Sequence, residues 1–276
     1  MTVLEARHLV KEYTLRNGLR TSTLRAVNDV SFSLVPGKTV ALVGQSGSGK
    51  STIAKLLLQL ERPTSGEILI DGTAVGRRGR RLAAYRGTVQ MVFQDPFASL
   101  NPYHSIGHHL ARPVRLHHRG MSRSDVQERV LDLLRRVRLD PAEDYAERKP
   151  HELSGGQRQR VAIARALAPD PGILIADEPV SMLDVSIRLG VLNLLADLQE
   201  ENELGVLYIT HDLATARHFS DEIMVLYHGE VVEQGPADSV ILHPQHSYTR
   251  LLREAAPDPE RRLAELRGAG RGASHV

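Results

Sequence analysis

The chain has 276 residues, of which 41% are apolar and 25% are charged, a composition typical of a globular protein with one large domain or two smaller ones. With 35 Lys and Arg residues against 33 Asp and Glu residues, the net charge of +2 does not by itself indicate a nucleic-acid partner. Cysteine is absent, which excludes disulfides, thiolate zinc sites, cysteine nucleophiles and cysteine-held iron–sulfur clusters.

No segment has the composition of a membrane-spanning helix. The longest stretch without a charged residue, 96–111, contains two prolines and three histidines, whereas a spanning helix needs about 20 mostly apolar residues. The first residues include acidic side chains and lack the apolar region of a signal peptide. We therefore expect the chain to stay on the side of the membrane where it is made, where it can still dock on a membrane protein.

The first third of the chain predicts mainly strands. Apolar runs bounded by turn residues predict them at 2–10, 22–34, 38–43, 66–72 and 88–94. Residues 51–60 have apolar side chains at helical spacing, and we expect Pro63 to end that helix. A basic run between the last two strands lacks interleaved aromatic residues and therefore predicts a solvated turn rather than a nucleic-acid patch. Its members are Arg77, Arg78, Arg80 and Arg81.

From about residue 95 to residue 168 the pattern changes to helices. The clearest is 124–139, where apolar residues share one face and Ser124 and Gln127 have the spacing of a capping box. Strand patterns then return at 172–177, 205–210, 222–228 and 230–235, with a helix at 187–199. This order predicts an α/β nucleotide-binding core with strands at the front and a helical insert in the middle.

Residues 44–51, Gly-Gln-Ser-Gly-Ser-Gly-Lys-Ser, match the phosphate-loop pattern between a predicted strand and a predicted helix. Glycines allow backbone N–H groups to turn toward phosphate oxygens at the positive end of a helix. Lys50 adds a cation for the β- and γ-phosphates, and Ser51 adds a hydroxyl for Mg²⁺. A chance match is on the order of one in a hundred, and a dinucleotide fold needs no Lys-Ser pair here. The motif predicts binding of a nucleoside triphosphate.

Residues 172–178 predict a buried strand that ends in two carboxylates. Asp177, at the carboxyl end of this strand, would lie beside the phosphate loop and hold Mg²⁺ directly or through water. Glu178 points in a different direction and can accept a proton from an attacking water. A solvated acidic turn would explain the pair alone, but the phosphate loop favours the catalytic interpretation.

Residues 153–157, Leu-Ser-Gly-Gly-Gln, precede a predicted helix. Ser154 and Gln157 have capping-box spacing, and the two glycines expose a second anion-binding helix end about a hundred residues after the first. Two such ends suggest that each nucleotide lies between two subunits. The stretch, placed before Ile-Leu-Ile-Ala-Asp-Glu-Pro, resembles the signature of ABC-type ATPases, and the resemblance extends over about residues 3–252.

This resemblance implies an α/β fold with a P-loop NTPase (RecA-like) core, an antiparallel β subdomain and a helical insert subdomain at about 95–168. It implies an ABC-type ATPase domain over 1–254 and leaves 255–276 as a short flexible tail. The implied ligands are ATP and Mg²⁺.

The family pattern also assigns roles to single positions. Gln94 matches the glutamine that contacts Mg²⁺ and water and reports to the transmembrane subunit, and His211 matches the histidine that contacts the γ-phosphate. Residues 181–184 resemble the D-loop, with Met182 where Ala is usual. The implied catalytic residues are Glu178, His211, Gln94 and Lys50, and the implied metal ligands are Ser51, Gln94 and Asp177. The implied nucleotide-binding residues are Tyr13, Gly44, Ser46, Gly47, Gly49, Lys50, Ser51, Thr52, Ser154, Gly155, Gly156, Gln157 and Asp184.

Tyr13 occupies the position where the family stacks an aromatic ring on adenine. An exposed strand tyrosine is the more common explanation of such a residue, so the stacking role is the less favoured of the two interpretations.

Three stretches, 91–102, 149–160 and 243–252, resemble the ATPases of oligopeptide, dipeptide and nickel importers. Those importers use two different ATPase chains, two transmembrane permease subunits and an extracytoplasmic binding protein. The implied partner is therefore a second homologous ATPase, as a heterodimer, at the cytoplasmic face of the cell membrane. Di- or oligopeptides are the leading cargo and nickel is the second. The cysteine-bound C-terminal cluster of some members is absent, because the chain has no cysteine.

Two alternatives stay open. A soluble ABC ATPase acting on nucleic acid or ribosomes usually has two cassettes or long coiled-coil insertions, and this chain has neither, so we expect no nucleic-acid partner. A metal site is conceivable in a histidine-rich region, but no carboxylate or cysteine completes a ligand set there. Its members are His104, His108, His109, His117 and His118.

Overall fold

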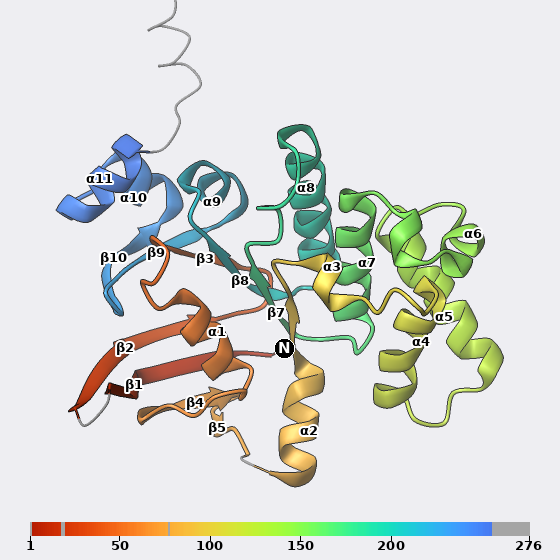
Figure 1. Cartoon of the computed structure of the whole chain (residues 1–276), viewed down its shortest axis with the longest axis horizontal. Helices are drawn as coiled ribbons and strands as arrows, with labels where there is room; N and C mark the ends of the chain where they lie inside the picture. The colour runs from red at the N-terminus through yellow and green to blue at the C-terminus, as the bar shows by residue number, and fades with distance from the viewer. Residues whose placement is uncertain (1, 18–19, 77, 256–276) are drawn as a thin grey trace, which may run out of the picture.

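The computed structural model describes residues 2–17, 20–76 and 78–255. They form an antiparallel sheet, a mainly parallel sheet, and a group of helices at the far side of the parallel sheet (Figure 1). Arg77 and residues 256–276, which include nearly all of the expected tail, lie outside the described residues.

The antiparallel sheet is built from the front of the chain. Its strand order is β2-β1-β4-β5. Its members are β1 (Leu4–Asn17), β2 (Arg20–Leu34), β4 (Ser65–Ile70) and β5 (Thr73–Ala74). The buried side chains of this sheet, such as Leu4 and Leu34, pack with apolar residues of α1 and of the parallel sheet in one core. The expected antiparallel β subdomain is confirmed.

The second sheet has six strands in the order β10-β9-β3-β8-β7-β6. Its members are β3 (Thr39–Val43), β6 (Val89–Val92), β7 (Ile173–Asp177), β8 (Gly205–Thr210), β9 (Glu222–Tyr227) and β10 (Glu230–Pro236). All neighbours are parallel except β10, which pairs antiparallel with β9 at the edge. The strands β3 and β8 are buried along their whole length because a parallel sheet is covered on both faces.

The parallel arrangement determines where the functional residues meet. In this sheet β3 pairs with β8 and β8 pairs with β7, all running in the same direction. The carboxyl ends of parallel strands lie at one edge of the sheet, where α/β proteins bind their ligands. The residues that follow β3, β7 and β8 therefore come together at that edge.

The helix after the phosphate loop is shorter than the sequence predicts. It is α1 (Lys50–Leu57), which leaves Leu58 to Leu60 outside the helix. Gln59 has a φ of 53°, a left-handed conformation that a helix cannot contain. The helix thus ends before Pro63 can act, and our expectation that Pro63 ends it is wrong.

Of the basic run, Arg78, Arg80 and Arg81 are described; they are exposed, as predicted, but they do not form a turn between strands. Arg80 and Arg81 lie in the first turn of α2 (Gly79–Thr88), a helix that the sequence analysis did not predict. Its single buried residue is Tyr85, whose hydroxyl donates to the carbonyl of Leu57 at 2.5 Å. A helix with one buried side chain has no apolar stripe, which explains why periodicity did not indicate it.

Helices fill the chain between β6 and β7 (Figure 1, right). They are α3 (Pro96–Ser99), α4 (Ile106–His117), α5 (Arg123–Arg136), α6 (Ala142–Glu147), a 3₁₀ turn (Pro150–Glu152) and α7 (Gly155–Leu167). The predicted apolar face of α5 is buried, as Val126, Leu133 and Leu134 show.

The capping box of α5 differs from the prediction. Ser122, not Ser124, is the N-cap: its hydroxyl accepts from the N–H of Asp125, and the Asp125 carboxylate accepts from the N–H of Ser122. Ser124 lies inside the first turn, so the expected pair of Ser124 and Gln127 is wrong. Both pairs have the same three-residue spacing, and only the extended backbone of Ser122 identifies the cap.

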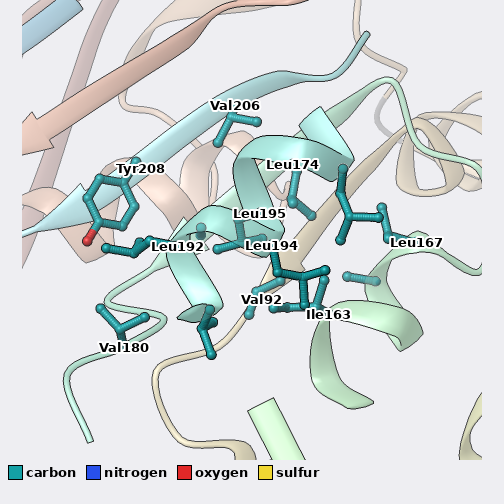
Figure 2. Close-up of a cluster of buried hydrophobic side chains, with 14 of the residues drawn as sticks. Val92, Ile163, Leu167, Leu174, Val180, Leu192, Leu194, Leu195, Val206 and Tyr208 are labelled. Carbon is teal, nitrogen blue, oxygen red and sulfur yellow. The ribbon is translucent and has the colours of Figure 1, made fainter. Parts of the chain in front are cut away.

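The helix α8 (Val185–Glu201) joins the helical region to the parallel sheet. Figure 2 shows its leucines, including Leu192 and Leu195, packed between Ile163 of α7 and Val206 of β8 in one buried cluster. The last helices of the described residues are α9 (Leu213–Phe219), α10 (Ala237–Leu242) and α11 (Ser247–Ala255). Within the described ranges, no helix is long and apolar enough to cross a bilayer.

Candidate functional site

The phosphate-loop motif connects the end of β3 to the start of α1. Gly47 and Gly49 have φ angles of 81° and 114°, which favour glycine. A Cβ on Gly49 would lie 2.3 Å from the carbonyl oxygen of Ala26, and one on Gly44 would lie 2.3 Å from that of Leu226. The glycines are therefore required for the loop to pass this close to neighbouring backbone.

Lys50 begins α1 and is only 7% exposed. Its Nζ donates to the carbonyl oxygens of Gly44 at 2.6 Å and Gln45 at 2.9 Å. Burial lowers the pKa of this ammonium, while the carboxylates of Glu178 and Asp177 act in the opposite direction. The carbonyl groups of Gly44 and Gln45 thus hold a buried ammonium group inside the loop that the motif predicts to bind phosphate.

The two carboxylates at the end of β7 differ in environment. Burial raises the pKa of Asp177, Glu178 raises it further, and Lys50 partly opposes the shift. Glu178 has a φ of 46°, and its N–H donates to the carbonyl of Ile209 at 2.9 Å. A left-handed conformation at a residue with a side chain is a strained feature that occurs often at functional sites.

Glu178 connects two other predicted residues. Gln94 Nε2 donates to one carboxylate oxygen at 3.0 Å, and Nδ1 of His211 lies 3.0 Å from the other. The side chain of Glu178 is 18% exposed and that of His211 is 61% exposed. The residues that follow β6 and β8 thus converge on the carboxylate that follows β7, which lines a large cavity.

This cavity has a volume of about 940 Å³. Most of the predicted site lines it: Tyr13, Gly44, Ser46, Gly47, Gly49, Lys50, Ser51, Thr52, Gln94, Asp177, Glu178 and His211. The volume is in the range of sites for cofactor-sized ligands.

Tyr13 lies on β1 at the wall of this cavity. Its hydroxyl donates to the carboxylate of Glu61, and Nζ of Lys11 is 4.9 Å from the centre of its ring. Burial and the bond to Glu61 raise the pKa of Tyr13. The hydroxyl is therefore fixed by the protein, and the side chain is not simply a solvated strand residue.

The signature stretch forms the start of α7, away from the cavity. The Ser154 hydroxyl accepts from the N–H of Gln157 at 3.3 Å, and Gln157 Oε1 accepts from the N–H of Ser154 at 2.9 Å, so the predicted capping box is present. A Cβ on Gly156 would lie 2.7 Å from Cγ2 of Ile187, which explains the need for glycine. Among the described residues that line the 940 Å³ cavity, none belongs to the set Ser154, Gly155, Gly156, Gln157 and Asp184.

Other residues of the cavity were not predicted. Arg188 of α8 lines it while donating to the carbonyl of Leu183 at 2.8 Å. Leu252 lines it from α11, and Tyr248 of the same helix contacts the phosphate loop. In the sequence, the stretch 243–252 indicates only a family resemblance, and no local pattern indicates that it returns to the phosphate loop.

The histidine-rich region lines a separate cavity of about 540 Å³ between β6, α4 and α7. The rings of His104 and His108 stack at 4.1 Å, and His109 Nε2 lies 3.0 Å from the carbonyl of Asn101. Across the described residues, no group of three or more His, Cys, Asp or Glu side chains is arranged to hold a metal ion.

The sequence profile of the ABC transporter family matches residues 27–181, which include the phosphate loop, the signature stretch and Glu178. The chain belongs to the ABC transporter family. The chain is thus an ABC-type ATPase.

Similar proteins support this membership. The chain is 46% identical over 274 residues to a di/tripeptide transport ATP-binding protein of Pseudomonas aeruginosa, covering 97% of this chain and 84% of the relative. It is 44% identical over 260 residues to an oligopeptide transport ATP-binding protein of Bacillus subtilis, covering 94% and 83%. A dimeric ATP-binding cassette solved in a post-hydrolysis state with ADP and Pi is 34% identical, with a TM-score of 0.74 over 85% of this chain and 98% of that one. The expected fold, including its P-loop NTPase core, is confirmed.

Proposed function

We propose that this chain is the ATP-hydrolysing subunit of an importer for di- or oligopeptides. The observation that supports the ATPase part of the proposal is the separation of two candidate anion sites in one chain: the phosphate loop lines the 940 Å³ cavity and the signature helix end does not. A site divided in this way is complete only when two ATPase chains face each other.

The phosphate loop binds the nucleotide phosphates in this proposal. Backbone N–H groups of residues 44–51 and the start of α1 supply donors, and Lys50 exchanges its carbonyl partners for β- and γ-phosphate oxygens. Tyr13, at the cavity wall, supplies an aromatic surface for adenine.

Mg²⁺ fits the side chains around the phosphate loop. The Ser51 hydroxyl, the Gln94 amide oxygen and the Asp177 carboxylate are the hard oxygen donors that this ion prefers, and all three line the cavity. Burial raises the pKa of Asp177 because it disfavours the charged carboxylate, and a bound dication would stabilise that charge. When bound, the ion would neutralise charge that develops on the phosphates.

Glu178 is the general base in this proposal. It accepts the proton of a water whose oxygen attacks the γ-phosphorus, while the bond between that phosphorus and the ADP oxygen breaks. Gln94 and His211 hold its carboxylate through contacts of 3.0 Å each, and His211 also offers a donor to the γ-phosphate.

The second half of the site comes from another ATPase chain. Ser154, Gly155, Gly156 and Gln157 present a capped helix N-terminus to the γ-phosphate of the opposite nucleotide, and Asp184 lies in the loop that meets that chain. The partner is a second homologous ATPase subunit.

The membrane partners are two permease subunits, served by an extracytoplasmic binding protein, with this chain at the cytoplasmic face. The segment 94–103 and the following helices should receive a permease segment, because Gln94 contacts Glu178 and the chain then enters the helical region. Cysteines introduced at 94–103 into this cysteine-free chain should crosslink to the permease. Crosslinks to nucleic acid alone would contradict the proposal.

The cargo is proposed from the two transport relatives, which are named for di/tripeptides and for oligopeptides. The test is reconstitution of the chain with its permease subunits in vesicles, followed by ATP-dependent uptake of a labelled tripeptide and of Ni²⁺. We expect peptide uptake that Lys50→Ala abolishes, because the β- and γ-phosphate charge is then uncompensated. Uptake of Ni²⁺ without peptide would assign the chain to nickel import instead.

A further inference from the structure

The C-terminal segment, residues 243–255, makes direct contact with the phosphate loop. The hydroxyl of Tyr248 accepts a hydrogen bond of 3.0 Å from the backbone N–H of Gln45. Tyr248 is only 6% exposed, and its ring centre lies 4.1 Å from that of Tyr227 at the end of β9. Buried aromatic contact fixes the ring, so the position of its hydroxyl is well defined.

Gln45 is held from two sides by this arrangement. Its N–H donates to Tyr248, and its carbonyl accepts from Nζ of Lys50 at 2.9 Å. A second support lies three residues further along the loop, where the Ser48 carbonyl accepts from the N–H of Gly229 at 2.9 Å. One of the two residues whose carbonyls hold the Lys50 ammonium is therefore itself held by the C-terminal segment.

The segment has its own anchor on the parallel sheet. The carboxylate of Glu233, on β10, accepts from the N–H groups of Gln245 at 2.8 Å and His246 at 3.0 Å. The N–H of Tyr248 in turn donates to Nδ1 of His246 at 3.2 Å. Tyr248 is thus positioned by β10 and β9 and does not depend on the loop for its own placement.

We propose that Tyr248 is a positioning residue of the ATPase, which fixes Gln45 and so pre-organises the first half of the phosphate loop for nucleotide binding. It acts through Gln45. The inference rests on the proposed role of residues 44–51 in phosphate binding. Without the Tyr248 hydroxyl, the free phosphate loop is more mobile and loses more conformational entropy when nucleotide binds. The affinity for nucleotide therefore falls, while the groups that carry out hydrolysis are unchanged.

The test compares Tyr248→Phe with Tyr227→Phe in the full-length chain. Both variants keep an aromatic ring in the same pair, whose ring planes are tilted by 36°. The hydroxyl of Tyr248 bonds to the phosphate loop, whereas that of Tyr227 has no hydrogen-bond partner among the described residues. The Kd for MgATP is measured by titration with a fluorescent ATP analogue, and amide exchange is measured over residues 43–50. We expect Tyr248→Phe alone to raise the Kd about three- to tenfold and to speed exchange in the loop.

Stability and turnover separate positioning from a general structural role. In the assembled transporter, kcat at saturating ATP should stay near the wild-type value while KM rises with Kd. The melting temperature of the nucleotide-free variant should fall by no more than about 4 °C. A Kd within about twofold of wild type, or an equal loss in Tyr227→Phe, overturns the inference.

Two further variants complete the design. If Tyr248→Phe does not fold, Glu233→Gln serves instead, because it weakens the anchor of the segment and keeps Tyr248. This variant must raise the Kd, and an unchanged Kd overturns the inference. Lys50→Ala distinguishes this failure from failure of the proposed function. If Lys50→Ala binds MgATP normally, the phosphate-loop assignment itself is wrong. If it loses binding while Tyr248→Phe does not, only the role of Tyr248 is wrong.

Discussion

The carboxylate of Glu178 and the imidazole of His211 face each other across the ends of two adjacent parallel strands, with Oε1 and Nδ1 3.0 Å apart. The backbone reinforces this pairing, because the N–H of Glu178 donates to the carbonyl of Ile209 in β8. A second side chain, that of Gln94, donates to the other carboxylate oxygen. The candidate base is therefore held at both oxygens and at its own backbone, which fixes its direction into the 940 Å³ cavity.

Glu178→Gln should keep ATP binding and slow hydrolysis by about 10²–10⁴-fold. The amide preserves the shape of the side chain but does not accept the proton of the attacking water, while Lys50 and Asp177 are unchanged. Single-turnover hydrolysis and ATP titration measure the two effects separately. Loss of binding in parallel with hydrolysis would contradict the assigned role.

Ser154→Arg should impair hydrolysis of the nucleotide held by the opposite chain, by about a hundredfold. The bulky cation would cover the helix end that must meet that γ-phosphate. The measurement mixes the variant with a wild-type partner chain and follows turnover at each site, with Lys50→Ala in the same chain as the comparison. If Ser154→Arg affected only the ATP bound at its own Lys50, the composite site would be wrong.

Tyr13→Ala should weaken ATP binding by about 1–3 kcal/mol, the usual contribution of an aromatic ring stacked on a base. Tyr13→Phe is the matched control, because it keeps the ring and loses only the hydrogen bond to Glu61. We expect it to retain affinity close to wild type. The Kd values for ATP and for inorganic triphosphate, which lacks the base, measure the effect; an equal loss for both ligands in Tyr13→Ala would exclude stacking.

The stability of the chain should depend on pH through Glu233. Burial disfavours its charge, but the N–H of Gln245, the neighbouring Thr249 hydroxyl and the N–H of His246 together outweigh burial and hold its pKa below the ordinary value of 4.5. A lowered pKa in the folded state stabilises the fold above about pH 4.5, and this contribution is lost as the pH falls below that value.

Glu233→Gln should therefore lower the free energy of unfolding at neutral pH by about 1 kcal/mol, and the difference from wild type should shrink below pH 4.5. The amide has one acceptor oxygen and so satisfies only one of the two N–H groups well. Urea unfolding of both proteins across this pH range gives the comparison. A difference that is constant with pH would mean that the charge of Glu233 has no part in it.

How much of the fold could be predicted depended on how local its signals are. The strand before the phosphate loop, the helix after it, the apolar face of α5 and the capping box at Ser154 follow from residues a few positions apart. The sequence does not predict the helix α2, because a single buried tyrosine forms no apolar stripe. It does not identify the cap at Ser122 either, because Ser124 and Gln127 have the same spacing as Ser122 and Asp125.

The sequence alone determined the chemistry of this protein, since the phosphate loop, the acidic strand end and the signature stretch are contiguous motifs whose residue types imply their ligands. Only the tertiary structure decided which of them share a cavity: it joins Gln94, Glu178 and His211, excludes Ser154, and brings Tyr248 onto Gln45. The reason is physical. Contacts between residues far apart in the chain depend on strand order and on how the two cores pack, and neither leaves a periodic signal in the sequence.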